Sequence, residues 1–330
     1  MDTLIYVIIA ILILLYIIDK KEPLPPMVDI QPAVKVKKDH ELLTNREKRD
    51  KIYKNIYKSI KEINPLKTYR SWTYIEIPEG RRNIQLSYNT LNIPVFFKKC
   101  IELMKNNIPE LIILTPINIK DYLPDFPIEM KYDSEIPLKL RIDLLFAYIL
   151  NSYGGLCISP GTIVYDVNRP LSMLKKYEIV TFGGNPTILQ SDNNLEYPNS
   201  YIIGSQANTP FIQEYKRLLS LLIKDTYLYN FKTVDDSDIL SYLIRKLEPP
   251  QFHFGTEYDG TYNSKLEKIH LSMYMGTHAI DFQNKERLIV ISIPYDTLLN
   301  TSKFQWFLKL SNEQFNSSNL EIKKLIQAGI

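Results

Sequence analysis

The chain has 330 residues, of which 45% are apolar and 12% aromatic, so it is long enough to bury one large hydrophobic core or two modest ones. A formal net charge of +3 is close to balanced and gives no reason to expect a nucleic-acid partner, so we predict none. The cysteines, Cys100 and Cys157, are too few for a disulfide framework or a zinc site and are expected to be buried thiols.

The first predicted element is a membrane anchor. Leu4–Ile18 is an unbroken apolar run that is closed by Asp19, Lys20 and Lys21. At ~1.5 Å per residue the run is slightly short for a ~30 Å hydrocarbon core, but lysines that snorkel to the interface extend its reach. A cleaved signal peptide would need a basic start and a small-residue cleavage site, and the sequence shows neither. We therefore predict an uncleaved, single-pass signal anchor over residues 1–21.

The side of the membrane is predicted from charge. Lysines follow the anchor up to residue 38, whereas no Lys or Arg precedes it. Because positive flanks favour the cytoplasmic side, we expect the large domain in the cytoplasm. Glycosylation sequons at Asn300 and Asn316 would be used only on the opposite side, and such short motifs often occur by chance. The charge asymmetry therefore decides the prediction.

The rest of the chain divides into a spacer and a globular domain. Residues 22–65 are polar and charged, which predicts a proline-rich extended spacer and a solvated stalk helix. The globular domain is expected over residues 66–330. Strands are expected within 70–78, 110–116, 156–166 and 177–183, and helices within 93–107, 137–155, 209–224 and 234–247. This alternation implies an α/β domain built on a mostly parallel sheet.

Carboxylates lie near the expected strand ends, where open α/β sheets bind their ligands. The candidates are Asp143, Asp166 and the acidic turn with Asp235, Asp236 and Asp238. Each also has a structural explanation. Asp143 lies early in a helix, Asp166 fits a turn, and the acidic turn can serve as an N-cap cluster for the helix that follows it. The histidines His253, His270 and His278 lack metal-ligand spacing and are expected to be structural or exposed.

Four sequence blocks carry a resemblance to a known family. They are "SWTYIEIPEG" from Ser71, the segment 94–127, the segment 140–174 that contains "NSYGGLCISPGTIV", and more weakly the segment 199–215. In this order and spacing they resemble the capsular-polysaccharide-synthesis and mannosyltransferase-like glycosyltransferases, whose sugar-binding region contains a DXD motif. The resemblance implies a GT-A-type, Rossmann-like nucleotide-sugar domain, here behind an N-terminal transmembrane helix.

The departures from the family pattern fall on its chemical positions. By resemblance, the donor-binding residues are Trp72, Asp143, Gly154, Gly155, Ser159 and Gly161. The two DXD carboxylates are replaced by Ser159 and Gly161, and the arginine of the signature by Phe146. Mn²⁺ or Mg²⁺ prefers carboxylate oxygens and would need them from Asp143, Asp166 or the acidic turn, so no metal ligand is assigned. Basic candidates for stabilising a diphosphate without metal are Arg81, Arg82 and Lys139.

Two functions follow as hypotheses. The first is a membrane-anchored glycosyltransferase that moves a sugar from a nucleotide-sugar donor to a glycan or protein acceptor. The alternative is a catalytically degenerate glycosyltransferase fold that serves as a binding or structural protein of a membrane or virion. The abundance of Ile, Lys, Asn and Tyr with only 11 Gly indicates an AT-rich genome, which suits a large DNA virus and hence a host or virion membrane.

Overall fold

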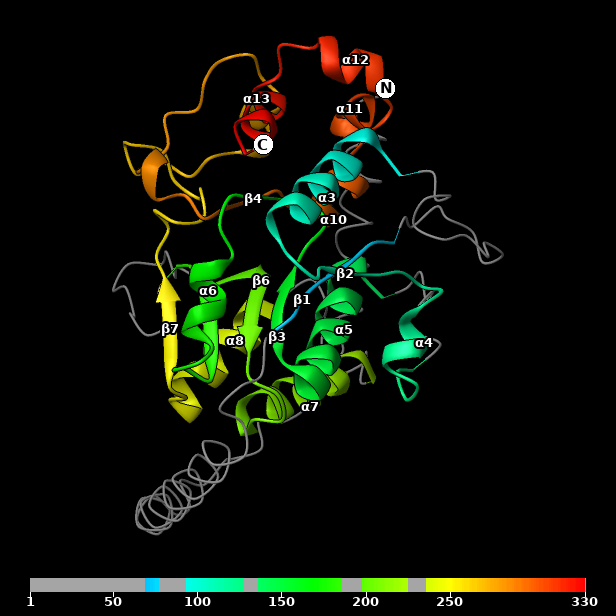
Figure 1. Cartoon of the computed structure of the whole chain (residues 1–330), viewed down its shortest axis with the longest axis vertical. Coiled ribbons are helices and arrows are strands. Elements are labelled where there is room, and N and C mark those ends of the chain that lie inside the picture. Colours follow the sequence, from blue (N-terminus) through cyan, green and yellow to red (C-terminus); the bar gives the residue numbers. More distant parts are fainter. Residues whose placement is uncertain (1–68, 77–92, 128–135, 185–197, 225–235, 330) are drawn as a thin grey trace, which may run out of the picture. The chain divides into compact units, whose positions relative to one another are not determined.

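The computed structural model describes residues 69–76, 93–127, 136–184, 198–224 and 236–329 (Figure 1). These ranges fall within one compact unit, Thr68–Ile330. The predicted anchor and spacer, residues 1–65, lie outside the described residues, so the predicted division of the chain stays a prediction. Within the described ranges, no helix has the length and apolar character that a membrane span requires.

The central feature is a six-stranded sheet with the order β2-β1-β3-β6-β5-β7 (Figure 1). Its strands are β1 (Ser71–Tyr74), β2 (Ile112–Leu114), β3 (Gly155–Ile158), β5 (Ile179–Gly183), β6 (Pro198–Ser205) and β7 (Gln251–Phe254). β1 pairs in parallel with β2 and β3, and β5 pairs in parallel with β7. β6 is antiparallel to its neighbours β3 and β5. The fold is therefore mixed α/β with mainly parallel pairing, as the sequence predicted.

This strand arrangement creates two distinct edges. Because only β6 is reversed among these strands, the carboxyl ends of the others lie together with the start of β6. We call this the carboxyl edge, and the opposite one, where β3 begins and β6 ends, the amino edge. Ligands of α/β sheets bind at the carboxyl edge, so the polar groups found there are the first candidates for a site.

The helices that the apolar periodicity predicted are present. They are α3 (Val95–Asn107), α5 (Leu138–Tyr153), α7 (Pro210–Lys224) and α8 (Asp236–Leu247). The predicted inward face of α3 is buried, and α5 packs against α7, which in turn packs against α8 (Figure 1). α5 is buried around most of its surface, which explains its nearly continuous apolar sequence. Two shorter helices lie in connecting segments: α4 (Ile119–Tyr122) follows β2, and α6 (Asn168–Met173) precedes β5.

The prediction of a strand within 156–166 is corrected by the structure, which divides this segment between two sheets. β3 ends at Ile158, and β4 (Thr162–Val164) pairs antiparallel with β8 (Val290–Ser292) in a separate two-stranded sheet. A turn separates them, in which Thr162 N donates to Ser159 O at 3.1 Å. Pro160 has no N–H to donate to a sheet, which favours a break at this point.

Beyond α8 the sequence analysis assigned no element, and the described chain there is mainly short helices. They are α9 (Leu271–Tyr274), α10 (Tyr295–Asn300), α11 (Gln305–Leu308), α12 (Asn312–Ser317) and α13 (Glu321–Ala328), with 3-10 turns η3 (Lys285–Arg287) and η4 (Ser302–Phe304). A capping box between Ser311 and Gln314 begins α12. α12 and α13 pack against α3, so the C-terminal region covers a helix from the start of the domain.

The turn between α5 and β3 requires glycine at both of its positions. Gly154 and Gly155 have φ of 66° and 106°, conformations that residues with a Cβ rarely adopt. A Cβ at Gly155 would lie 2.1 Å from Arg70 O, the backbone of the residue before β1. The double glycine therefore lets β3 approach β1, and its effect on the fold is independent of any ligand.

We expect Gly155→Ala to lower the free energy of unfolding by about 3 kcal/mol or more, because the backbone is strained and the carbonyl of Arg70 cannot move away without breaking the sheet. Chemical denaturation of the purified chain measures the change. Gly276→Ala is the matched control, since its Cβ would come no closer than 3.2 Å to Met273 O and its effect should be smaller. Equal effects of the two substitutions would contradict this explanation.

Candidate functional site

Three of the predicted donor-binding residues act in the packing around the amino edge. The Trp72 side chain is fully buried, and its Nε1 donates to Gly154 O at 3.0 Å. Its ring contacts those of Tyr122 and Tyr153 at centroid distances of 5.6 and 5.2 Å. Together with the close approach at Gly155, these contacts fix β1 against the start of β3. These residues thus have a structural role in the fold, and donor binding by them stays a prediction.

Ser159 and Gly161 lie in the turn that follows β3, at the carboxyl edge. Ser159 is buried, and its N–H donates to Tyr201 O at 2.8 Å. Gly161 O accepts a hydrogen bond from Ile293 N at 3.2 Å, and a Cβ at Gly161 would lie 2.8 Å from Ile293 O. The turn is held by its backbone, and position 161 has no room for a side chain.

A connected group of polar side chains surrounds this turn. Lys139 and Asp143, one helical turn apart on α5, form an ion pair at 2.9 Å in which the Asp143 side chain is only 4% exposed. Lys139 Nζ also donates to Ser200 Oγ at 2.7 Å and lies 4.8 Å from the ring centre of Tyr201. The Tyr201 hydroxyl donates to Asp296 Oδ1, on α10, at 2.8 Å. The predicted residues Asp143 and Lys139 are thus joined to two residues, Tyr201 and Asp296, that the sequence analysis did not select.

A buried ion pair lies just beyond the end of β1. Arg141 Nη1 donates to both carboxylate oxygens of Glu76 at 2.7 Å, and Tyr74 OH donates to Glu76 Oε2 at 2.7 Å. Tyr295 OH donates to the Glu76 carbonyl. Burial raises the pKa of the Glu76 carboxyl, against the lowering effect of the Arg141 guanidinium and the two hydrogen bonds. Removing one partner of such a pair typically costs about 3–5 kcal/mol, because it leaves the other charge buried without a partner.

Both residues of this pair lie in the blocks that resemble the family, but the sequence does not show that they pair. Glu76 is the glutamate of "SWTYIE", in the block from Ser71, and Arg141 lies in the segment 140–174. The pairing joins positions 65 residues apart, which no local spacing can indicate.

None of the contacts given above joins the remaining predicted carboxylates to Asp143 or to Glu76. Asp166 Oδ1 accepts a hydrogen bond from Asn168 N at 2.8 Å. This contact fits the turn that was the structural explanation for Asp166. Asp235 lies outside the described residues, as do Arg81 and Arg82. Asp236 and Asp238 are in the first turn of α8, and the structure describes their backbone only.

A further buried carboxyl, that of Asp259, lies farther along the carboxyl edge. Asp259 is 2% exposed and accepts hydrogen bonds from Asn199 Nδ2 at 3.2 Å and from the Thr261 N–H at 3.0 Å. Burial raises the pKa of Asp259 to about 6. Nearby, His253 Nε2 lies 2.9 Å from Gly183 O and its Nδ1 lies 3.0 Å from Thr181 Oγ1. Burial lowers the pKa of His253, which fits a neutral structural imidazole.

The described residues do not fit a divalent cation. Among them, no three His, Cys, Asp or Glu side chains gather closely enough to hold a metal ion. At the turn itself, Ser159 offers a neutral hydroxyl and Gly161 only its backbone, whereas a hard cation prefers carboxylate oxygens. We therefore derive no step through Mn²⁺ or Mg²⁺.

The family resemblance is confirmed by a family model. The model described as "Capsular polysaccharide synthesis protein" matches residues 91–236, the range that holds α3, α5, α7 and the turn after β3. No curated protein sequence matches the chain. The family match thus covers the carboxyl edge from β2 to β6 and includes Asp143, Ser159 and Gly161.

Solved structures of glycosyltransferases are similar to the chain at low identity. PaToxG glycosyltransferase is 14% identical, with a TM-score of 0.34, over 61% of this chain and 78% of that one. The apo-form glycosyltransferase GlyE of Streptococcus pneumoniae is 13% identical, with a TM-score of 0.38, over 77% of this chain and 65% of that one. The galactosyltransferase LgtC, in complex with donor and acceptor sugar analogues, is 10% identical, with a TM-score of 0.36, over 74% and 98%. Scores at this level carry no argument about the site.

We expect the buried Asp259 to make the stability of the protein depend on pH. Its pKa is about 6 in the folded chain against 3.8 for the ordinary group, so the folded state binds the proton more tightly. Its contribution to the free energy of unfolding should therefore fall by on the order of 2–3 kcal/mol as the pH rises from about 4 to about 6. Denaturation curves of wild type and Asp259→Asn across this range measure the contribution as a difference. Glu102→Gln, at an exposed carboxylate, is the control; a constant difference for Asp259→Asn would contradict the expectation.

Proposed function

We propose that the chain is a membrane-anchored glycosyltransferase that transfers a sugar from a nucleotide-sugar donor to a glycan or protein acceptor at the carboxyl edge. The observation that carries the proposal is the Lys139–Asp143 pair, which lies at this edge within the range of the family match. A carboxylate and an ammonium side by side offer both an acceptor for sugar hydroxyls and a counter-charge for a diphosphate.

The proposed division of labour follows from the charges. Asp143 accepts hydrogen bonds from hydroxyls of the donor sugar, because an ionised carboxylate is an acceptor only. Lys139 stabilises the negative charge that develops on the leaving diphosphate, the electrostatic contribution that group transfer depends on most. Ser200 and the Tyr201 ring hold the Lys139 ammonium, at 2.7 and 4.8 Å, and Asp296 holds the Tyr201 hydroxyl. Tyr201 and Asp296 are thus positioning residues.

We expect Asp143→Asn to lower the turnover of nucleotide sugars about 100-fold, as removal of a charged transition-state contact does. The assay measures hydrolysis and transfer by the full-length chain with UDP- and GDP-linked hexoses, each with Mn²⁺ and with a chelator. Turnover should persist with the chelator, because Lys139 supplies the counter-charge.

The control for this experiment is Glu102→Gln, which removes a comparable but exposed ion pair with Lys99. It should leave turnover unchanged. Undiminished turnover by Asp143→Asn would overturn the proposed role of that residue. Donor binding without turnover by the wild type would instead favour the alternative function, a degenerate fold that acts as a binding module.

The proposed membrane attachment rests on the apolar run before Asp19. We expect the full-length chain to sediment with membranes and to resist extraction by high salt or alkaline carbonate, because a buried apolar helix is not held by charge. Deletion of residues 1–21 should release the protein to the supernatant. A full-length chain that high salt alone extracts would count against an anchor. The cytoplasmic orientation and a viral source stay predictions from charge and composition.

A further inference from the structure

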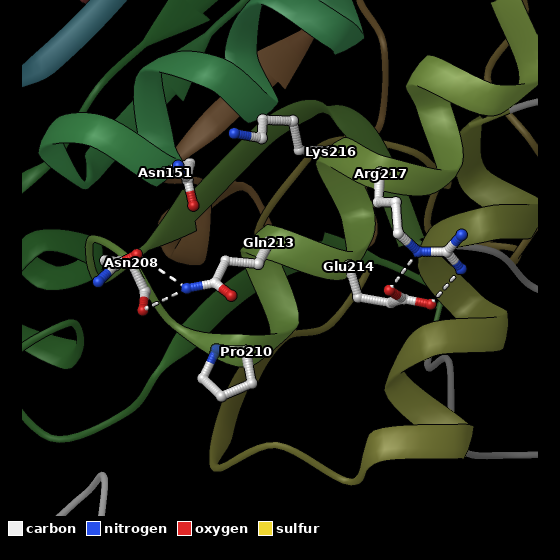
Figure 2. A pocket seen from close by; sticks show the side chains of 7 residues that line it. All are labelled: Asn151, Asn208, Pro210, Gln213, Glu214, Lys216 and Arg217. Carbon is white, nitrogen blue, oxygen red and sulfur yellow. Dashed lines mark hydrogen bonds and ion pairs between the residues drawn. The ribbon is translucent and has the colours of Figure 1, made fainter.

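A polar cavity of about 510 Å³ lies at the amino edge, away from the proposed donor site (Figure 2). It is lined by Asn151 near the end of α5, by Asn208 in the loop after β6, and by residues of the first two turns of α7. Asn151 precedes β3 and Ser159 follows it. At about 3.3 Å per residue, β3 alone separates the cavity from the turn at the carboxyl edge by roughly 13 Å.

The groups in this cavity have hydrogen-bonding capacity to spare. Asn151 Oδ1 is buried and has no hydrogen-bond partner among the described residues. Gln213 Nε2 donates to Asn208 Oδ1 at 2.8 Å and to Asn208 O at 3.3 Å, and Figure 2 shows this pair among the lining residues together with Asn151. Lys216 Nζ lies 4.8 Å from the ring centre of Tyr148, a contact that leaves its N–H groups for a ligand. A buried carbonyl oxygen without a partner is uncommon in native proteins, and a ligand that enters the cavity would satisfy it once the Asn151 side chain turns toward the cavity.

The cavity does not have the character of an anion site. The N–H groups at the start of α7 are already bonded: Phe211 N to Glu178 Oε1 at 3.2 Å, Ile212 N to Thr209 Oγ1 at 3.3 Å and Gln213 N to Thr209 O at 3.0 Å. Glu214 adds a carboxylate to the lining, bonded to Arg217 by two hydrogen bonds of 2.7 Å. The N–H groups at the start of the helix are therefore satisfied internally, and what remains is a set of neutral carboxamides with the single ammonium group of Lys216.

We propose that this cavity binds a neutral saccharide unit of a glycan, at a site separate from the donor site. Carboxamides donate and accept hydrogen bonds side by side, as the neighbouring hydroxyls of a sugar do, and this complementarity selects a polyhydroxyl ligand over a charged one. A hydroxyl of the sugar donates to Asn151 Oδ1, and Lys216 donates to a sugar oxygen. The choice of a glycan as ligand rests on the proposed function, but its binding does not require turnover.

Calorimetry and amide hydrogen exchange on the full-length chain test the proposal with mannotetraose, maltotetraose and cellotetraose. We expect saturable binding of at least one, with slower exchange over residues 148–153 and 206–217. Asn151→Leu and Lys216→Met should each weaken that binding about 5- to 10-fold, the effect of one hydrogen bond. Asn151→Leu should not lower the melting temperature, because the oxygen it removes has no partner in the unliganded chain.

One control variant and one competing ligand complete the experiment. Glu102→Gln, at an exposed ion pair outside both sites, should bind the saccharide as the wild type does. Saccharide binding does not require turnover, so it is expected even if sugar transfer is never found. The proposal is overturned if none of the three tetrasaccharides binds, or if Asn151→Leu and Lys216→Met bind like the wild type. It is also overturned if inorganic phosphate protects the same amides, which would make the cavity an anion site.

Discussion

The hydrogen bond from the Trp72 indole to Gly154 O joins β1 to the turn from which β3 starts. The 2.1 Å that a Cβ at Gly155 would have to Arg70 O shows how closely the two strands approach there. α5 ends in the same turn, and its first two turns carry the ion pair of Lys139 and Asp143. The contacts at the amino edge therefore help to place that pair relative to Ser159, at the far end of β3.

The turn after β3 is tied to the C-terminal part of the chain. A side chain at Gly161 would meet Ile293 O at 2.8 Å, so no residue with a Cβ fits there without moving the segment that follows β8. The same segment brings Asp296 to Tyr201. One C-terminal segment thus both excludes a side chain from position 161 and supplies a carboxylate at the carboxyl edge.

The spacing of apolar residues predicted most of the helices and strands up to α8. This spacing is a local property of the sequence, and it marks the face of each element that is buried in the folded chain. It did not predict that the chain breaks between β3 and β4, after which β4 pairs with β8, more than a hundred residues away. The candidate site, like the fold, was predicted only in part. Asp143 and Lys139 were identified from α5 itself, whereas Glu76, Tyr201 and Asp296 acquire their partners only through tertiary contacts. Sequence spacing does not contain that information.

The bond between Tyr295 and the backbone of Glu76 joins residues 219 positions apart. At about 5–20 residues per second, a ribosome needs on the order of 10–40 s to synthesise the chain between them. During that time the end of β1 can already pair with Arg141, but its backbone groups lack their partner. The order of synthesis therefore leaves the end of β1 without its contact to Tyr295 until α10 has left the ribosome.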